Sequence, residues 1–181
     1  MIKLSFFIKE KEHELFPQLE PLRFSVHRDH KIVWKSEDAS LIIQPFSVVG
    51  RESQGYRAYF KGNPETLQYL FNNFISCFSP EISGIEYILD TSKGQHECVT
   101  IAERNRLKKG AMYSLYEHNK VMIVILPDGR ITFQIRNRKI KQSELAKVLK
   151  EINSVVDIFR PQEFNLFSYL GSDSEEGATA S

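Results

Sequence analysis

Two short runs of basic residues are the part of the sequence best suited to chemistry with an anion. Residues 104–109 read Arg-Asn-Arg-Leu-Lys-Lys, and residues 136–141 read Arg-Asn-Arg-Lys-Ile-Lys. The guanidinium group of arginine is a planar fork that matches a phosphate group, and asparagine can bond to base edges. Tyr113 and Tyr116 lie between the runs, and a ring that stacks on an unpaired base contributes about 1–3 kcal/mol. The spacing therefore favours contact with a nucleic acid.

The charge distribution points in the same direction. The whole chain of 181 residues has a formal net charge of +1, which by itself identifies no partner. Residues 104–150, however, hold twelve Lys or Arg residues against three acidic residues, and the rest of the chain is acidic. Such asymmetry is typical of a protein that binds a polyanion. The residues predicted to bind nucleic acid are Arg104, Arg106, Lys108, Lys109, Tyr113, Tyr116, Arg130, Arg136, Arg138, Lys139 and Lys141.

The same charges have two other interpretations. The basic residues can be solvated strand ends whose charges meet the acidic N-terminal part inside the fold. They can also form a patch that binds an acidic protein. If the partner is a nucleic acid, the sequence separates neither DNA from RNA nor single from double strands.

The C-terminal part combines an aromatic segment with an acidic tail. The side chains of Phe164, Leu166, Phe167 and Tyr169 either pack back on the domain, as large aromatic side chains usually do, or bind a protein partner. Residues 164–169 resemble the aromatic peptides by which DNA-working proteins grip sliding clamps, although Gln162 stands one place earlier than the glutamine of those peptides. Residues 171–181 carry no large apolar side chain and are expected to be disordered. This layout resembles acidic-tailed single-stranded-DNA-binding proteins, in which the tail competes with phosphate.

Motifs for catalysis or metal binding are weak. Gly50 and Gly55 have P-loop spacing, but Tyr56 and Arg57 stand where Lys and Ser or Thr are required. The segment His27-Arg28-Asp29-His30 is the best ligand cluster, and it has no third ligand nearby. We therefore expect no metal and no cofactor.

Candidate nucleophiles depend on geometry that a sequence does not supply. Ser92 is followed directly by Lys93, and Cys98 has His118 as a distant candidate base. Each pair would act only if the fold held it within hydrogen-bond reach. The two cysteines, Cys77 and Cys98, are too few for a disulfide framework or a zinc site. No catalytic residue is predicted, and the protein is expected not to be an enzyme.

The elements that must position these residues are mostly strands. Dense β-branched and aromatic residues between turn residues predict strands at Ile2–Ile8, Leu22–His27, Lys31–Trp34, Leu41–Val49, Tyr56–Lys61, Ile85–Leu89, Glu97–Ala102, Met112–Tyr116, Val121–Leu126 and Arg130–Ile135. Residues 127–129, Pro-Asp-Gly, predict a tight turn between the last two. Apolar stripes predict one helix capped by Asn63 and stopped by Pro80, and a second from Ser143 to Arg160.

These patterns predict an α+β fold, with a largely antiparallel sheet, two amphipathic helices and a disordered acidic C-terminal tail. Residues 1–160 are expected to form one domain, followed by the aromatic segment 161–170 and the tail 171–181. The sequence contains neither a signal peptide nor a run of about 20 apolar residues, which predicts a soluble protein without membrane partners in a reducing compartment, cytoplasmic or nuclear.

Three functions are compatible with these features. The first is a non-enzymatic nucleic-acid-associated protein that binds the phosphate backbone through its basic central region and uses its tail to hold a protein partner. The alternative is a protein–protein module, such as an inhibitor, an immunity protein or an assembly adaptor. The third is a small hydrolase or nuclease whose site forms only in three dimensions.

Overall fold

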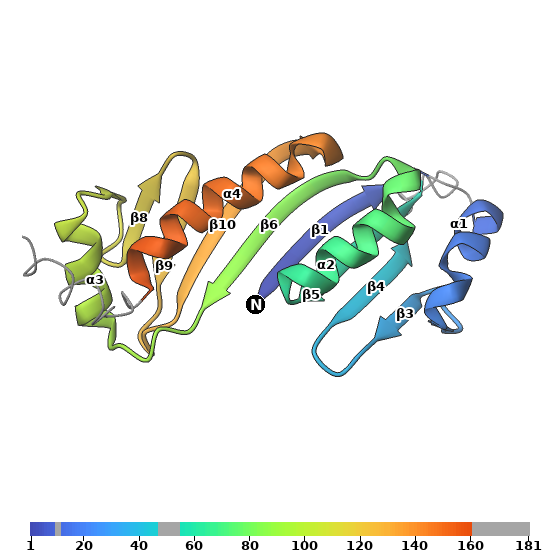
Figure 1. The fold of residues 1–181 in the computed structure, drawn as a ribbon, viewed down its shortest axis with the longest axis horizontal. Helices are drawn as coiled ribbons and strands as arrows, with labels where there is room; N and C mark the ends of the chain where they lie inside the picture. Colours follow the sequence, from blue (N-terminus) through green and yellow to red (C-terminus); the bar gives the residue numbers. More distant parts are fainter. Residues whose placement is uncertain (10–11, 47–54, 161–181) are drawn as a thin grey trace, which may run out of the picture.

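The described residues form a single antiparallel sheet of ten strands (Figure 1). A computed structural model describes residues 1–9, 12–46 and 55–160. The strand order is β2-β3-β4-β5-β1-β6-β10-β9-β8-β7. The strands are β1 (Ile2–Ile8), β2 (Ser25–Val26), β3 (Ile32–Lys35), β4 (Ser40–Pro45), β5 (Tyr56–Gly62), β6 (Glu81–Leu89), β7 (Lys108–Lys109), β8 (Leu115–His118), β9 (Val121–Ile125) and β10 (Ile131–Lys141). The mixed fold with a large antiparallel sheet is confirmed.

The two halves of the sheet have the same connectivity. Residues 2–78 run through β1, helix α1 (Glu12–Leu19), strands β2 to β5 and helix α2 (Pro64–Leu70). Residues 81–159 run through β6, helix α3 (Gln95–Arg104), strands β7 to β10 and helix α4 (Gln142–Phe159). The strand order reads symmetrically outward from the central pair β1 and β6. The fold therefore consists of two units that have the same topology.

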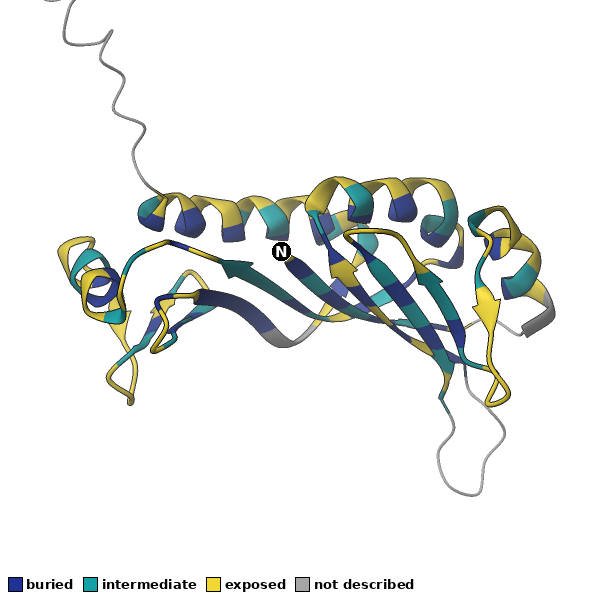
Figure 2. Cartoon of the chain, turned by 90° about the horizontal axis from the view of Figure 1, so that it is seen from below, coloured by how far each residue is buried: buried dark blue, intermediate teal, exposed yellow. Residues whose placement is uncertain are grey.

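Alternation along the central strands places the core on one face of the sheet. In β1, Ile2, Leu4, Phe6 and Ile8 are buried, whereas the residues between them are half-buried. In β5, the buried and exposed residues alternate without interruption. Helices α2 and α4 cover the buried face (Figure 2). Each half carries an edge-to-face ring contact between sheet and helix layers, Phe6 with Phe71 and Phe133 with Phe159.

Local signals set the ends of the two long helical segments. The side chain of Asn63 accepts a hydrogen bond from the N–H of Thr66 at 2.7 Å, which caps α2. The segment continues through a π-helical stretch (Phe71–Ile75) and a 3-10 turn (Ser76–Phe78), and Ser79 then takes a left-handed conformation before Pro80. At α4, the Glu144 carboxylate accepts a bond from the Lys141 N–H at 3.0 Å. The helical segments 64–78 and 142–159 therefore end close to the predicted bounds.

The predicted strand at Glu97–Ala102 is wrong, because these residues belong to α3. Cys98, Val99 and Ala102 are the buried residues of that helix, a spacing that also fits one helical face. The dense β-branched residues indicated a strand, but packing against the sheet favoured the helical alternative. Helix α1 was not predicted, and its Leu15 and Leu19 are buried.

The predicted turn between β9 and β10 is confirmed. Gly129 has a φ of +83°, and a Cβ at this position would lie 1.7 Å from the carbonyl oxygen of Lys93. The Asp128 carboxylate accepts a bond from the Arg130 N–H at 3.1 Å. Glycine is therefore required here by both conformation and space.

Other predicted elements are found with shifted bounds. Strand β10 extends beyond Ile135 to Lys141, and β8 begins at Leu115 instead of Met112. Pro45 ends β4. Its only partner in the sheet is Tyr56 of β5, because β3 pairs with Ser40–Ile43 alone. The missing N–H of Pro45 therefore breaks no ladder bond. The end of the predicted strand at 47–49, the aromatic segment and the acidic tail lie outside the described residues.

Candidate functional site

The face of the sheet opposite α2 and α4 is not covered by either helix, and we call it the open face. Its residues alternate with the core residues and lie beside one another in the strand registers, as Lys3 does with Lys61 and with Glu86. Most are half-buried or exposed. Figure 2 shows both long helical segments on the other side. The open face is therefore the broadest surface on which an extended partner could lie.

Cations outnumber carboxylates on the open face. Its basic residues on the strands are Lys3, Lys35, Arg57, Lys61, Lys108, Lys139 and Lys141, and its acidic residues are Glu81, Glu86 and Glu117. Between them lie apolar and aromatic side chains, including Phe7, Ile42, Tyr59, Met122 and Val124. This mixture of ammonium or guanidinium groups with rings and methyl groups suits a ligand that has both phosphates and bases.

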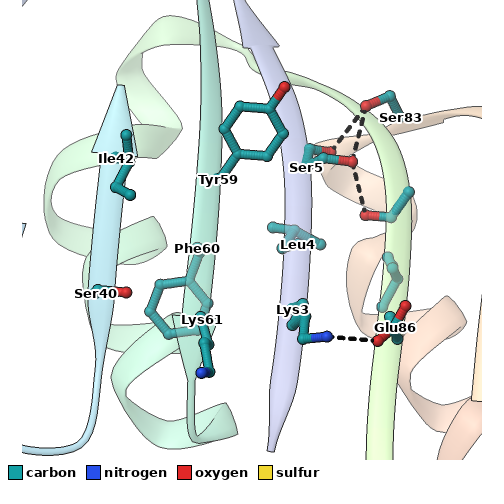
Figure 3. A pocket seen from close by; sticks show the side chains of 12 residues that line it. Lys3, Leu4, Ser5, Ser40, Ile42, Tyr59, Phe60, Lys61, Ser83 and Glu86 are labelled. Carbon is teal, nitrogen blue, oxygen red and sulfur yellow. Dashed lines mark hydrogen bonds and ion pairs between the residues drawn. The ribbon is translucent and has the colours of Figure 1, made fainter. Parts of the chain in front are cut away.

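A hollow of about 540 Å³ lies near the middle of the open face (Figure 3). The Lys3 Nζ is 2.8 Å from Glu86 Oε1, and the Gln134 side-chain amide donates to Glu86 Oε2 at 3.2 Å. Ser5 and Ser83 share a hydroxyl contact of 3.1 Å. Gly84 opens the floor, because a Cβ there would lie 3.1 Å from the Ser5 hydroxyl. The hollow therefore presents hydroxyl and ammonium groups beside the side chains of Ile42 and Tyr59, with no side chain at Gly84.

Lys61 and Arg57 are the cations of the first half that are most available. Both are exposed on β5, and within the described part of the chain no carboxylate lies within ion-pair distance of either. The Arg57 guanidinium lies 4.6 Å from the centre of the Phe46 ring, which in turn contacts Phe7 edge to face. A guanidinium on a ring is held in place while its N–H groups stay free for a ligand.

The first predicted basic run lies at the outer edge of the second half. Arg104 ends α3 and Arg106 follows it with a φ of +54°, both exposed. Lys108 and Lys109 form β7, where their ammonium groups lie 3.5 Å from Glu117 and 3.5 Å from Glu103. Arg104 and Arg106 are therefore more available than the two lysines.

The second run lies on β10, and Arg130 stands in the turn before that strand. The Arg130 N–H and guanidinium group bond to the Asp128 carboxylate, the latter through Nε at 2.7 Å, and these bonds hold the pKa of that carboxyl below its usual value. Lys139 Nζ is 3.2 Å from Glu81, whereas Lys141 is exposed. Arg136 pairs with Gly84 in the register; its side chain and that of Arg138 lie outside the described set.

The structure does not bring the two basic runs together. Lys108 is in register with Glu117, Met122 and Gln134 on the successive strands β8, β9 and β10. Three strand spacings separate Lys108 from Gln134, and they amount to about 14 Å. Lys139 and Lys141 lie still further along β10. The predicted residues are therefore spread over the second half of the open face and its margin.

The two predicted stacking tyrosines differ in availability. Tyr113 is 59% exposed, with Lys109 Nζ 5.6 Å from its ring centre. Tyr116 is 1% exposed on the core side, so its ring is not available to a base in this conformation. Burial, together with the nearby Glu103 carboxylate, raises the pKa of the Tyr116 hydroxyl.

The cations of the first half were missed by the sequence reasoning. Lys3, Lys35, Arg57 and Lys61 lie outside the segment of high basic density, in a part of the chain that is acidic on average. The signal was present in residues 56–62, where Arg57, Tyr59 and Lys61 alternate with apolar residues. An average over a segment hides a charged face that period-two alternation reveals.

The weaker chemical motifs do not converge. The Thr91 hydroxyl donates to the Gly129 carbonyl at 2.9 Å, beside the buried Cys98 thiol at 3.5 Å, which is a packing arrangement at the start of α3. His118 is half-buried on β8 and contacts Asn119, and within the described residues no hydrogen bond joins it to that thiol. Within residues 1–9, 12–46 and 55–160, no cluster of His, Cys, Asp or Glu side chains could hold a metal ion. In the same residues no helix is long and apolar enough to cross a membrane.

Comparisons with known proteins give little beyond the fold described above. No family model matches the chain, and no curated protein matches it. Among solved structures, the chain is similar to Methanococcus jannaschii TBP, at 9% identity and a TM-score of 0.29, over 88% of this chain and 95% of that chain. The likeness is too distant to carry a functional inference.

Proposed function

We propose that the protein is a non-enzymatic nucleic-acid-associated protein that contacts the phosphate backbone through the open face. The observation that supports this most directly is the excess of cations over carboxylates on a half-exposed sheet face that the long helices leave free. Lys61 and Arg57 have no carboxylate partner among the described residues. Uncompensated charge on one face attracts a polyanion and makes its binding depend on salt.

The role of each group follows from its surroundings. Lys61, Arg57, Lys141 and Arg104 act as phosphate contacts, because each is exposed. Lys3 and Lys139 are already paired with carboxylates and contribute less. Tyr59 and Tyr113 supply the exposed rings, at 38% and 59% exposure. Such a surface would bind without strong sequence preference, because phosphate contacts and ring stacking are common to all sequences.

The decisive experiment measures the affinity of the full chain for labelled single- and double-stranded oligonucleotides over a range of salt concentrations. Phosphate contact predicts that the logarithm of the binding constant falls linearly with the logarithm of the salt concentration. Lys61→Glu should weaken binding, whereas Lys147→Glu, the same charge change on exposed α4, should leave it nearly unchanged. Absence of binding at low salt would exclude this function and leave the protein–protein module.

A further inference from the structure

Helices α2 and α4 lie on the side of the sheet away from the open face (Figure 2). A groove of about 400 Å³ is lined by residues of both helical segments. Its floor is apolar and includes Leu67 and Phe71 from the α2 segment and Leu145 and Leu149 from α4. Its rim is polar and includes Lys150. Leu67, Phe71 and Leu145 are already buried in the fold. Leu149 is half-buried, and a further apolar side chain in the groove would cover it.

The chain itself supplies suitable side chains close to this groove. Helix α4 ends at Phe159, and the aromatic segment begins at Phe164. Leu149 lies ten residues before the end of α4, which corresponds to about 15 Å along the helix axis. Four extended residues span about 13 Å. These lengths would allow residues 164–170 to reach the groove if the chain reversed its direction after Arg160.

The order of chemical groups in the tail matches the order of surfaces along α4. From the C-terminal end of α4 towards its start, the groove comes first, and a second hollow of about 510 Å³ follows. This hollow is lined by Lys141 and by the ion pair of Lys139 with Glu81. In the chain, the aromatic segment comes first, and Asp173, Glu175 and Glu176 follow. Apolar residues would therefore face the apolar groove while carboxylates face the cations.

The cations along this path are available. Lys141 and Lys150 are exposed, and within the described residues neither has a carboxylate within ion-pair distance. The first turn of α4 also carries the partial positive charge of a helix start, which adds to the attraction for carboxylates. The ends of the groove thus complement both parts of the tail.

We propose that residues 164–170 of this chain dock in the groove between α2 and α4, with Asp173, Glu175 and Glu176 directed to the lysines at the start of α4. The contact is intramolecular. Phe164, Leu166 and Phe167 provide the apolar anchors. Docking of the aromatic residues does not depend on the nucleic-acid function proposed above, whereas the carboxylates would compete with phosphate for Lys141, which that function also uses.

The test uses the full chain with a nitroxide spin label in the aromatic segment. Cys77→Ser removes the exposed thiol, Cys98 is buried and unreactive, and Ser168→Cys provides the attachment point. Methyl signals of Leu67, Leu145 and Leu149 should lose most of their intensity. Those of Val33 and Leu115, at distant parts of the sheet, should not. Unchanged signals at Leu149 would overturn the proposal.

Substitutions in the aromatic segment and in the groove test whether the apolar side chains hold the segment in place. Phe164→Ser with Phe167→Ser should restore the Leu149 signals, and Ala146→Glu should do the same by placing a carboxylate in the groove. Ser154→Glu is the matched control, because Ser154 is exposed on α4 but does not line the groove. Signal loss that persists in the double serine variant would show that the aromatic anchors do not hold the segment.

A mixing experiment distinguishes the intended occupant from a second copy of the chain. Spin-labelled protein without isotopes is mixed with isotope-labelled protein without a spin label. Docking within one chain predicts full signals at Leu149 in the mixture. Weakened signals would mean that the segment binds a neighbouring molecule, which overturns the intramolecular assignment.

Discussion

Lys3 and Lys61 lie directly opposite each other on β1 and β5, and Glu86 on the other side of β1 pairs with Lys3. Like charges at directly opposed positions of a sheet destabilise it. Glu86 offsets one of the two charges, and no described carboxylate offsets the other. The fold therefore keeps an uncompensated ammonium group beside the central hollow of the open face.

Replacement of Lys61 should weaken oligonucleotide binding without lowering the stability of the fold. Lys61→Gln removes the repulsion and is expected to leave the free energy of unfolding unchanged or to raise it by at most about 1 kcal/mol. The same change should weaken oligonucleotide binding and reduce the salt dependence by about one phosphate contact. Urea unfolding and binding titrations measure the two effects. A large loss of stability would mean that Lys61 has a structural role.

The Asp128–Arg130 contact should give the turn between β9 and β10 a specific pH dependence. Because the folded-state pKa of Asp128 is lowered, its stabilising contribution is present above its unfolded pKa of about 3.9 and is lost as the pH falls through the folded-state value. The stability difference between wild type and Asp128→Asn should therefore be constant near neutral pH and shrink in acid. A difference that stays constant down to the lowest folded pH would contradict this.

Gly129 is expected to tolerate no side chain. Gly129→Ala places a Cβ against the carbonyl oxygen of Lys93 and forces alanine to a positive φ, so we expect a loss of about 2–4 kcal/mol in unfolding free energy. Gly94→Ala, a few residues from the same contact, is the control, because a Cβ there meets no atom within 4 Å. Equal effects of the two substitutions in urea unfolding would refute the close approach.

Removal of the buried Tyr116 hydroxyl should not lower the stability of the fold. Its hydroxyl has no hydrogen-bond partner among the described residues, although the ring is in the core. Tyr116→Phe keeps the ring and removes the unsatisfied group, so the melting temperature should stay the same or rise. A clear fall would indicate that the hydroxyl is bonded in solution.

The acidic tail should compete with nucleic acid. Asp173, Glu175 and Glu176 changed together to Asn, Gln and Gln should tighten oligonucleotide binding at low salt, since three negative charges near the basic surface are removed. Ser172→Ala with Ser174→Ala is the neutral control. Identical affinities for all three proteins would end the idea of a competing tail.

Period-two alternation and turn chemistry were enough to predict most of the sheet. Ile2–Ile8, Tyr56–Lys61 and the Pro-Asp-Gly turn were recognisable because their side chains decide the structure locally. Residues 97–102 were not, because a short β-branched segment fits a strand or a helix and only tertiary packing chooses. Of the cations in the candidate site, only those in the second half of the sheet were predictable from the sequence. The sequence does not reveal that β1 and β5 add their lysines to the same surface, since that depends on pairing between distant strands.

The two halves of the sheet share the same strand order but carry different side chains on the open face. Strands β5 and β10 occupy corresponding places in the two halves, as do β4 and β9. On the open face, β5 offers Arg57, Tyr59 and Lys61, whereas β10 offers Thr132 and Gln134 near its start and Lys139 and Lys141 only at its far end. The two equivalent strands therefore hold their charges at different places along the sheet. An elongated partner laid across the seam between β1 and β6 would meet a different surface on each side of it.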